Sequence, residues 1–231
     1  MVGDPKLWER GLPSEADFWE QWLSSDEYAG ERQRRIQMHQ RKEQFDPQLL
    51  ELLHKKVGDT IRVLDVGSGP ISCLTPYSSS NKIELVCTDV LAHTYNEMLQ
   101  RHGILGLPRV EEVKAEELRS VFGEQWFDVV HCSNALDHCA NPLIAFIEMY
   151  RVCRNNGILV LWSFENEGKQ SGYDGLHQWN LEPAENGVRL WNESTDINLL
   201  DHVNFQDFVC EYTETFAKGY TGFSVRLRVI H

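Results

Sequence analysis

The sequence lacks the features of membrane, secreted and nucleic-acid-binding proteins. No apolar run approaches the about 20 residues that a membrane-spanning helix needs, and the first 23 residues lack the apolar core of a signal peptide. Basic residues are scarce, since 22 Lys and Arg stand against 35 Asp and Glu, a formal net charge of −13. Such a surface repels phosphate backbones, so no nucleic-acid partner is expected, and a small tRNA-facing patch stays only as an alternative. We therefore expect a cytoplasmic protein without a membrane partner.

Paired cysteines are also missing, although the chain has six cysteines. None stands in a CxxC pair, so the spacing of a zinc ribbon is absent. A disulfide framework is not expected in a chain of this length without a secretion signal. We predict buried, reduced thiols at Cys73, Cys87, Cys132, Cys139, Cys153 and Cys210.

The length and composition predict one globular domain. The 231 residues, of which 42% are hydrophobic, suffice for a sizeable core. The N-terminal part carries helical patterns, with a capping-box-like start at Ser14 for a helix over 14–25 and a second helix opened by Asp46-Pro47. We expect residues 1–58 to form a helical lid or connector and residues 59–231 to form the main domain.

In the rest of the chain, short apolar runs alternate with helical patterns, which is typical of a parallel sheet buried on both faces. One helix is expected over 142–154, with Asn141 as its N-cap. The tail differs, because 205–216 and 220–230 alternate apolar and polar residues around a Lys218-Gly219 turn, the pattern of an antiparallel hairpin. The expected strands of the parallel sheet are 61–66, 82–90, 107–113, 126–132 and 157–164.

A polar and aromatic stretch, 165–204, separates the fifth expected strand from the hairpin. It is too long for a plain crossover, and insertions of this length usually cap a site. We therefore predict that this stretch covers the substrate.

The stretch LDVGSGP, residues 64–70, predicts a cofactor site at the carboxyl end of the first strand. Gly67 and Gly69 allow a sharp turn and a close backbone approach to a ligand, and Pro70 suits the first turn of a following helix. Asp89 ends the second strand about 20 residues later, where a carboxylate can accept hydrogen bonds from ribose hydroxyls. The pattern indicates an adenosine-containing cofactor.

Two features favour S-adenosylmethionine over a dinucleotide. Asp65 stands just before the glycines, where a carboxylate opposes a pyrophosphate but suits a cationic amino acid moiety, held directly or through water. Ser72 occupies the position of the third glycine of GxGxxG, so the dinucleotide fingerprint is incomplete. An NAD-dependent oxidoreductase stays as the alternative.

The chain resembles class I S-adenosylmethionine-dependent methyltransferases in five ordered motifs over about residues 60–165: VLDVGSGP, VCTDVLA, VKAEEL, FDVVHCSNALDH and RVCRNNGILVLW. The resemblance implies an α/β fold with a Rossmann-like doubly wound seven-stranded sheet, mostly parallel with an antiparallel C-terminal hairpin. Two departures, Pro70 for a frequent glycine and Asn155-Asn156-Gly157 for a Pro-Gly-Gly turn, fit the required turns. The pair FWEQWL and GLHQWNL also resembles a bacterial subgroup of small-molecule methyltransferases.

The resemblance also implies roles for nine residues. The glycine loop would pass beneath the methionine part of the cofactor, and the fourth strand's end would contact the same part through backbone groups. The acid that ends the second strand would bind the ribose, and three residues would surround the adenine. These residues are Gly67, Ser68 and Gly69 in the loop, Asp89 at the ribose, Val90, Ala115 and Glu116 at the adenine, and Cys132 and Ser133 at the fourth strand's end.

Candidate groups for the methyl acceptor lie in FDVVHCSNALDHCANP, residues 127–142, and in the insertion. A hydroxyl acceptor benefits from a general base with a pKa near neutrality, and histidine is the natural choice. The candidates are Asp137, His138 and His177. The Asp137-His138 pair could instead cap a helix, and His177 could bond to a loop backbone. His131 is expected inside the fourth strand as a packed or hydrogen-bonded residue.

A divalent metal held by Asp137, His138 and His177 is a competing interpretation of this cluster. The resemblance allows it, since some relatives methylate sugar or catechol hydroxyls with magnesium. Magnesium prefers oxygen ligands and two histidines fit it poorly, so no metal is expected.

The favoured function is O-methylation of a small polar metabolite or of a sugar unit, with S-adenosylmethionine as cofactor. N- or S-methylation of a small molecule and a non-catalytic cofactor-binding module stay as alternatives. The expected partner is a small-molecule substrate, and the chain could form a homodimer.

Overall fold

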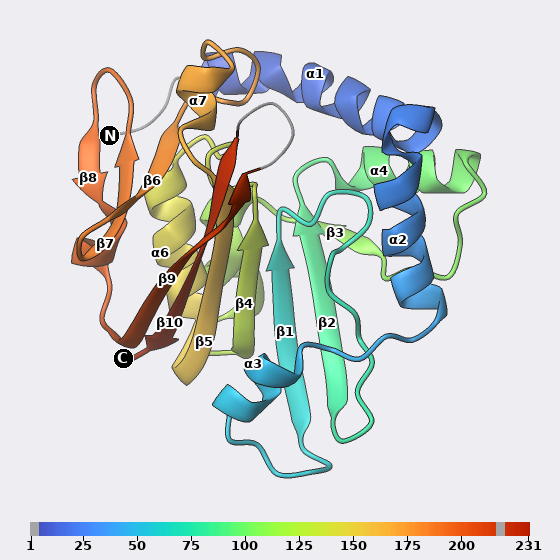
Figure 1. The fold of residues 1–231 in the computed structure, drawn as a ribbon, viewed down its shortest axis with the longest axis vertical. Helices are drawn as coiled ribbons and strands as arrows, with labels where there is room; N and C mark the ends of the chain where they lie inside the picture. The colour runs from blue at the N-terminus through green and yellow to red at the C-terminus, as the bar shows by residue number, and fades with distance from the viewer. Residues whose placement is uncertain (1–4, 216–219) are drawn as a thin grey trace.

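The computed structural model describes residues 5–215 and 220–231 and contains a seven-stranded sheet in the order β3-β2-β1-β4-β5-β10-β9 (Figure 1). The first five strands in this order run parallel to one another, and β10 is antiparallel to both β5 and β9. The strands are β1 (Thr60–Val66), β2 (Lys82–Asp89), β3 (Val110–Glu112), β4 (Phe127–Ser133), β5 (Cys153–Phe164), β9 (Phe205–Thr215) and β10 (Thr221–Val229). The predicted α/β architecture, with its mostly parallel sheet, is confirmed.

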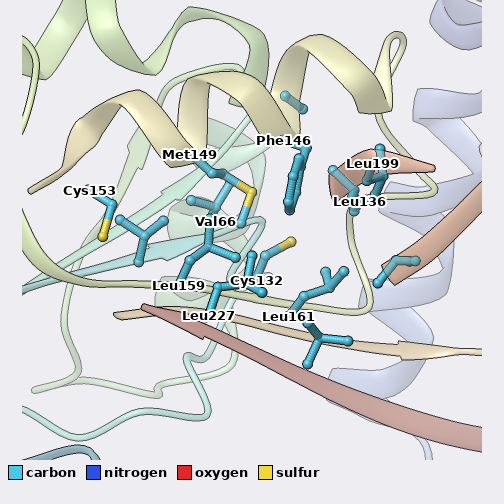
Figure 2. Close-up of a cluster of buried hydrophobic side chains, with 14 of the residues drawn as sticks. Val66, Cys132, Leu136, Phe146, Met149, Cys153, Leu159, Leu161, Leu199 and Leu227 are labelled. Atoms are coloured by element: carbon cyan, nitrogen blue, oxygen red, sulfur yellow. The ribbon is translucent and has the colours of Figure 1, made fainter. Parts of the chain in front are cut away.

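Alternation of side chains along the strands sends apolar residues to both faces of the sheet. On β1, Leu64 belongs to the core cluster that includes α6 (Pro142–Val152), whereas Val63 belongs to a cluster with α3 (Pro47–Leu52). Figure 2 shows Phe146 of α6 above the strands of the first cluster. Helices on both faces explain why the strand sequences are nearly continuous apolar runs.

Two helix starts predicted from capping residues are confirmed. Asn141 caps α6, and its Oδ1 accepts a hydrogen bond from Ile144 N at 3.2 Å, with Pro142 in the first turn. Asp46 caps α3, and its Oδ1 accepts from Gln48 N at 2.8 Å. The other helical segments between the strands are α4 (Ala92–Arg101), η2 (Ala115–Glu117) and α5 (Leu118–Phe122).

The N-terminal segment forms α1 (Pro5–Ser24), η1 (Asp26–Tyr28) and α2 (Ala29–Gln40) before α3. The helix predicted over 14–25 therefore begins earlier, and the prediction of Ser14 as its cap is wrong. Ser14 lies inside α1, where its Oγ donates to Gly11 O at 2.7 Å. The extra turns are held by contacts outside the helix, since Trp8 Nε1 donates to His138 O at 2.8 Å.

The crossover from β1 to β2 contains no helix, so the prediction that Pro70 opens one is wrong. The carbonyl groups of this loop are paired with α2 instead. Arg35 Nη1 donates to Ile71 O at 3.1 Å, and His39 Nε2 donates to Ser72 O at 3.0 Å. Because buried carbonyls need a partner and α2 supplies it, the loop does not need helical hydrogen bonds.

Residues 165–204 form a compact unit beside the sheet. Leu181, Val188 and Leu199 of this unit join the same core cluster as α6. In Figure 1, α7 lies near α1, at the end of the molecule where the parallel strands finish. The elements of the unit are α7 (Glu167–Gln170), the antiparallel strands β6 (Asn180–Ala184), β7 (Gly187–Trp191) and β8 (Asp196–Asn198), and η3 (Leu199–His202).

The C-terminal hairpin is confirmed by the antiparallel pairing of β9 with β10. The predicted Lys218-Gly219 turn lies outside the described residues. None of the helices in the described ranges combines the length and apolarity needed to cross a membrane.

All six cysteines are free thiols, as predicted. Cys87, Cys132 and Cys153 are buried, and the other three are half-buried rather than fully buried. Reduced thiols of this kind act as small apolar side chains in the core.

Candidate active site

A cavity of about 1050 Å³ opens at the carboxyl ends of the parallel strands, the end of an open sheet at which ligands bind. α1 lies across this end in Figure 1, and its side chains join those of α2 and of the insertion in the lining. His138 and His177 also line the cavity, and Asp137 lies buried beside them. The lining includes all ten residues predicted for the cofactor: Asp65, Gly67, Ser68, Gly69, Asp89, Val90, Ala115, Glu116, Cys132 and Ser133.

The glycine loop turns sharply at the end of β1. Gly67 and Gly69 have φ angles of 64° and 61°, a left-handed conformation that favours glycine. A Cβ atom at Gly69 would lie 2.8 Å from Trp19 Cζ2, and one at Gly67 would overlap Ala135 Cβ. Both positions therefore need glycine for the backbone turn and for space.

Asp89 ties the end of β2 to the glycine loop. Its Oδ2 accepts from Gly69 N at 3.2 Å, and its Oδ1 accepts from Leu91 N at 2.9 Å. A carboxylate has about four acceptor sites, so Asp89 keeps the capacity to accept from two further hydroxyls. Burial raises the pKa of Asp89 to about 6, although the two backbone N–H groups oppose this shift. At neutral pH the carboxylate is mainly ionised.

Asp65 and His131 are neighbours in the register of β1 with β4, and both are buried at the cavity wall. His131 Nδ1 donates to Asp65 Oδ1 at 2.7 Å, and Ser72 Oγ donates to Asp65 Oδ2 at 2.5 Å. His131 thus lies inside β4 as a hydrogen-bonded residue, as predicted, and its partner is on the neighbouring strand β1. Its partnership with Asp65 was missed, although pairing the central strands in register would have suggested it. The carboxylate of Asp65 is held in place by two donors.

Asp137, His138 and His177 converge on one point at the cavity wall. His138 Nε2 lies 3.0 Å from His177 Nδ1. Asp137 Oδ2 lies 3.3 Å from His177 Nδ1 and 3.5 Å from His138 Nε2. The capping alternative for the Asp137-His138 pair does not hold, because Asn141 caps the helix that follows.

Negative charge surrounds the two imidazoles. Burial alone would lower the pKa of His138, but the charges of Asp137 and of nearby glutamates raise it to about 9. Burial opposes ionisation of Asp137, yet the neighbouring His138 and His177 lower its pKa below the ordinary value. Burial raises the pKa of Glu167, and the charge of Asp137 raises it further. The cluster is therefore built to hold positive charge.

Glu167 belongs to this cluster and was missed by the sequence reasoning. Its Oε2 lies 3.9 Å from His177 Nδ1 and accepts from Asn134 Nδ2 at 3.0 Å. Asn134 in turn accepts at Oδ1 from Phe164 N at 3.1 Å. A usable signal existed, since Glu167 follows the fifth strand at the edge where the other candidates were expected.

Comparison with known proteins agrees with this geometry. The family model described as a methyltransferase domain matches residues 64–161, which run from the end of β1 through β2, β3 and β4 into β5. A search of the curated proteins found no match.

Solved structures similar to the chain include three whose titles describe them as methyltransferases. The trans-methyltransferase CalH in complex with S-adenosylhomocysteine is 18% identical, with a TM-score of 0.53 over 79% of this chain and 55% of CalH. The N-methyltransferase NodS from Bradyrhizobium japonicum WM9, with the same ligand, is 14% identical, with a TM-score of 0.52 over 92% of this chain and 96% of NodS. The CurJ carbon methyltransferase is 16% identical, with a TM-score of 0.54 over 79% of this chain and 51% of CurJ. The chain thus spans about half of CalH and CurJ but nearly all of NodS.

Residues 64–161 of the chain form a class I S-adenosylmethionine-dependent methyltransferase domain. The domain match excludes the NAD-dependent oxidoreductase that the glycine loop alone left open.

The residues of this methyltransferase fit the cofactor that its family uses, S-adenosylmethionine. Asp89 has free acceptor capacity where a ribose would lie, and Asp65 offers a fixed carboxylate for an ammonium group. The cavity is large enough for a cofactor together with a small acceptor, since ligand sites commonly measure about 300–1,000 Å³.

In this methyltransferase α1 closes the cavity from above the glycine loop. Glu15 Oε1 accepts from Trp19 Nε1 at 2.7 Å, and Glu15 Oε2 lies 3.9 Å from His138 Nδ1. Trp8 and Trp22 also line the cavity, and Trp22 is buried in the core. The tryptophans thus pack α1 against the cavity.

Proposed function

We propose that this methyltransferase transfers a methyl group to a hydroxyl of a small polar metabolite or of a sugar unit. The observation that carries the proposal is the cluster of Asp137, His138 and His177 at the wall of the cofactor cavity. A hydroxyl needs to lose its proton to become a good nucleophile, and two groups are positioned to take it. They are His177 and, in its neutral form above its pKa of about 9, His138. An acceptor already basic, such as an amine, would need no such group.

The bound cofactor supplies an electrophilic methyl group, and the remaining task of the protein is alignment. Asp65, Asp89 and the glycine loop hold the cofactor, each through a carboxylate or a backbone fixed by the contacts described above. The acceptor lies on the side of His138, where residues 171–177 complete the cavity. We propose that residues 165–204 cap the acceptor and that the helices within residues 1–58 act as a lid.

The similar structures support methyl transfer but differ in the acceptor atom. NodS is titled an N-methyltransferase and CurJ a carbon methyltransferase. The choice of oxygen therefore rests on the histidine cluster of this chain and not on those proteins.

The experiment is transfer of a labelled methyl group to a panel of polar hydroxyl compounds and sugars, each paired with its amine and thiol counterpart. We expect O-methylated products, identified by mass spectrometry and NMR. His138→Ala and His177→Ala should each lower turnover about 10²–10⁴-fold. His202→Ala is the control, because this histidine is exposed on η3 of the same insertion.

Three outcomes would contradict the proposal. Transfer only to amines or thiols would make the enzyme an N- or S-methyltransferase. Unchanged turnover in the double variant H138A/H177A would remove the base assignment. Tight binding of S-adenosylhomocysteine without transfer to any acceptor would favour a non-catalytic cofactor-binding module.

A further inference from the structure

Four potential ligand atoms of the histidine cluster face a common centre. Asp137, His138, Glu167 and His177 each offer one ligand atom, and these four atoms lie within 4.8 Å of one another. The separations from His177 Nδ1 are 3.0 Å to His138 Nε2, 3.3 Å to Asp137 Oδ2 and 3.9 Å to Glu167 Oε2.

These separations match the edges of a tetrahedron around a metal ion. Ligands about 2.0–2.1 Å from zinc stand about 3.3–3.4 Å apart in tetrahedral geometry. Octahedral magnesium at a similar bond length would bring adjacent ligands to about 2.9 Å. The three closest contacts, at 3.0, 3.3 and 3.5 Å, scatter around the tetrahedral value.

The hydrogen bonds and ion pairs of the two carboxylates also favour a bound cation. Asp137 is 1% exposed, and its Oδ1 has no hydrogen-bond partner among the described residues. In the same part of the chain, the ion pairs of Asp137 and Glu167 are with histidines rather than with lysine or arginine. Only the titratable imidazoles of His138 and His177 pair with these two carboxylates, and a divalent ion that takes both imidazoles in their neutral form as ligands would balance both negative charges.

We propose that Asp137, His138 and His177, with Glu167 as a more distant fourth ligand, bind one divalent transition-metal ion. Two imidazoles and two carboxylates suit zinc or manganese better than magnesium or calcium. Catalytic metal sites have three protein ligands and a fourth position for water or substrate, so a substrate oxygen can displace the loosely held Glu167 from that position.

What the ion does rests on the proposed function, whereas its binding does not. In the loaded enzyme the facing nitrogens are ligands, so the ion takes over activation of the hydroxyl from the histidines. The ion lowers the pKa of the hydroxyl, whose proton passes to solvent. The oxygen lone pair then forms the bond to the methyl carbon, and the carbon–sulfur electrons return to sulfur, which becomes a neutral thioether.

A second group with metal-ligating atoms, Asp65, Cys73 and His131, is the competing location. Asp65 already accepts from Ser72 and His131, so its lone pairs toward this group are occupied. The test therefore includes a variant of each group.

The experiment is calorimetric titration of chelator-treated enzyme with Zn²⁺, Mn²⁺ and Mg²⁺, together with the visible spectrum of added Co²⁺. We expect one equivalent of Zn²⁺ or Mn²⁺, no comparable Mg²⁺ binding and the intense absorption of tetrahedral Co²⁺. His177→Ala should weaken binding about a hundredfold and Glu167→Gln about tenfold. His202→Ala and Cys73→Ser should leave it unchanged.

The outcomes separate this inference from the proposed function. Absence of binding, or loss of binding in Cys73→Ser rather than in His177→Ala, overturns the metal site even if the histidines serve as bases. Binding of one ion without transfer to any hydroxyl supports the metal site and overturns the proposed function. Circular dichroism of each variant checks that a loss of binding is not a loss of fold.

Discussion

Asp89 holds the glycine loop through Gly69 N and, in the proposed site, also accepts hydrogen bonds from the cofactor. Burial raises its pKa to about 6, so acid protonates it more readily than an ordinary aspartate. A neutral carboxyl is a weaker acceptor than a carboxylate. We expect the Kd for S-adenosylhomocysteine to be constant above about pH 7 and to rise toward tenfold per pH unit below pH 6. Calorimetry from pH 5 to pH 8 measures this dependence.

Asp89→Asn is the matched control for that profile. The amide cannot titrate, so binding should be weaker at pH 8 and nearly independent of pH down to pH 5. A variant that kept the wild-type slope would assign the titration to another group of the cavity.

The positions of residues in local sequence motifs could be predicted, whereas hydrogen bonds between residues far apart in the sequence could not. The glycine loop and Asp89 belong to motifs whose geometry is set within a few residues of each strand end. The bond from His131 to Asp65 spans 66 positions, and the contact of Glu167 with Asn134 spans 33. Such contacts depend on which strands become neighbours, and side-chain patterns alone do not determine that.

At the scale of elements, α1 packs on the insertion through a glycine. A Cβ atom at Gly11 would lie 2.6 Å from Leu176 Cδ2 and 2.9 Å from the carbonyl carbon of Gly175. Because the second contact is with backbone, Gly11→Ala should push α1 away from residues 171–177. We expect a lower Tm, faster hydrogen exchange in that segment and a higher KM for the acceptor.

Gly30→Ala is the control, because Gly30 lies in α2 with no atom within 4 Å of its added Cβ. Alanine in a helix is about 0.5–1 kcal/mol more favourable than glycine, so this variant should raise the Tm slightly. Equal behaviour of the two variants would show that α1 does not depend on this contact.

Elements were predictable where their hydrogen bonds are internal to a sheet or helix. The five apolar runs and the hairpin all form strands, because apolar patterning records burial directly. Two bounds were wrong: β3 covers only Val110–Glu112, and β5 begins at Cys153, so α6 ends two residues early and the predicted turn at 155–157 lies within the strand. The missing helix after β1 and the early start of α1 depend on bonds from Arg35, His39 and Trp8 to distant carbonyls. These long-range hydrogen bonds override local helix propensity, and the sequence near the loop or the helix start does not reveal them.

At the scale of the whole molecule, the N-terminal segment that we propose as a lid also contributes to the core. Phe45, Leu49 and Leu53 pack with Ile61 and other buried strand residues on one face of the sheet. Removal of residues 1–24 should leave a folded protein with a lower Tm and weak cofactor binding. Removal of residues 1–58 should expose that sheet face and abolish cooperative unfolding. Circular dichroism melts of the two truncated chains test this.

A cooperative melt of the shorter chain would make residues 1–58 a separable appendage, as the predicted division at residue 58 suggests. Failure of both truncated chains to fold would instead make α1 part of the minimal folding unit.

The position of α1 has a consequence for synthesis of the chain. Trp8 bonds to a carbonyl 130 positions later, so a ribosome releases α1 long before its binding surface exists. Until then the tryptophans of α1 are exposed to solvent, and α1 can dock only after the insertion has left the ribosome. The acids Glu15, Asp17 and Glu20, interspersed among the aromatic residues, keep the waiting helix soluble. α1 is therefore made before the segments it contacts and docks only once they are in place.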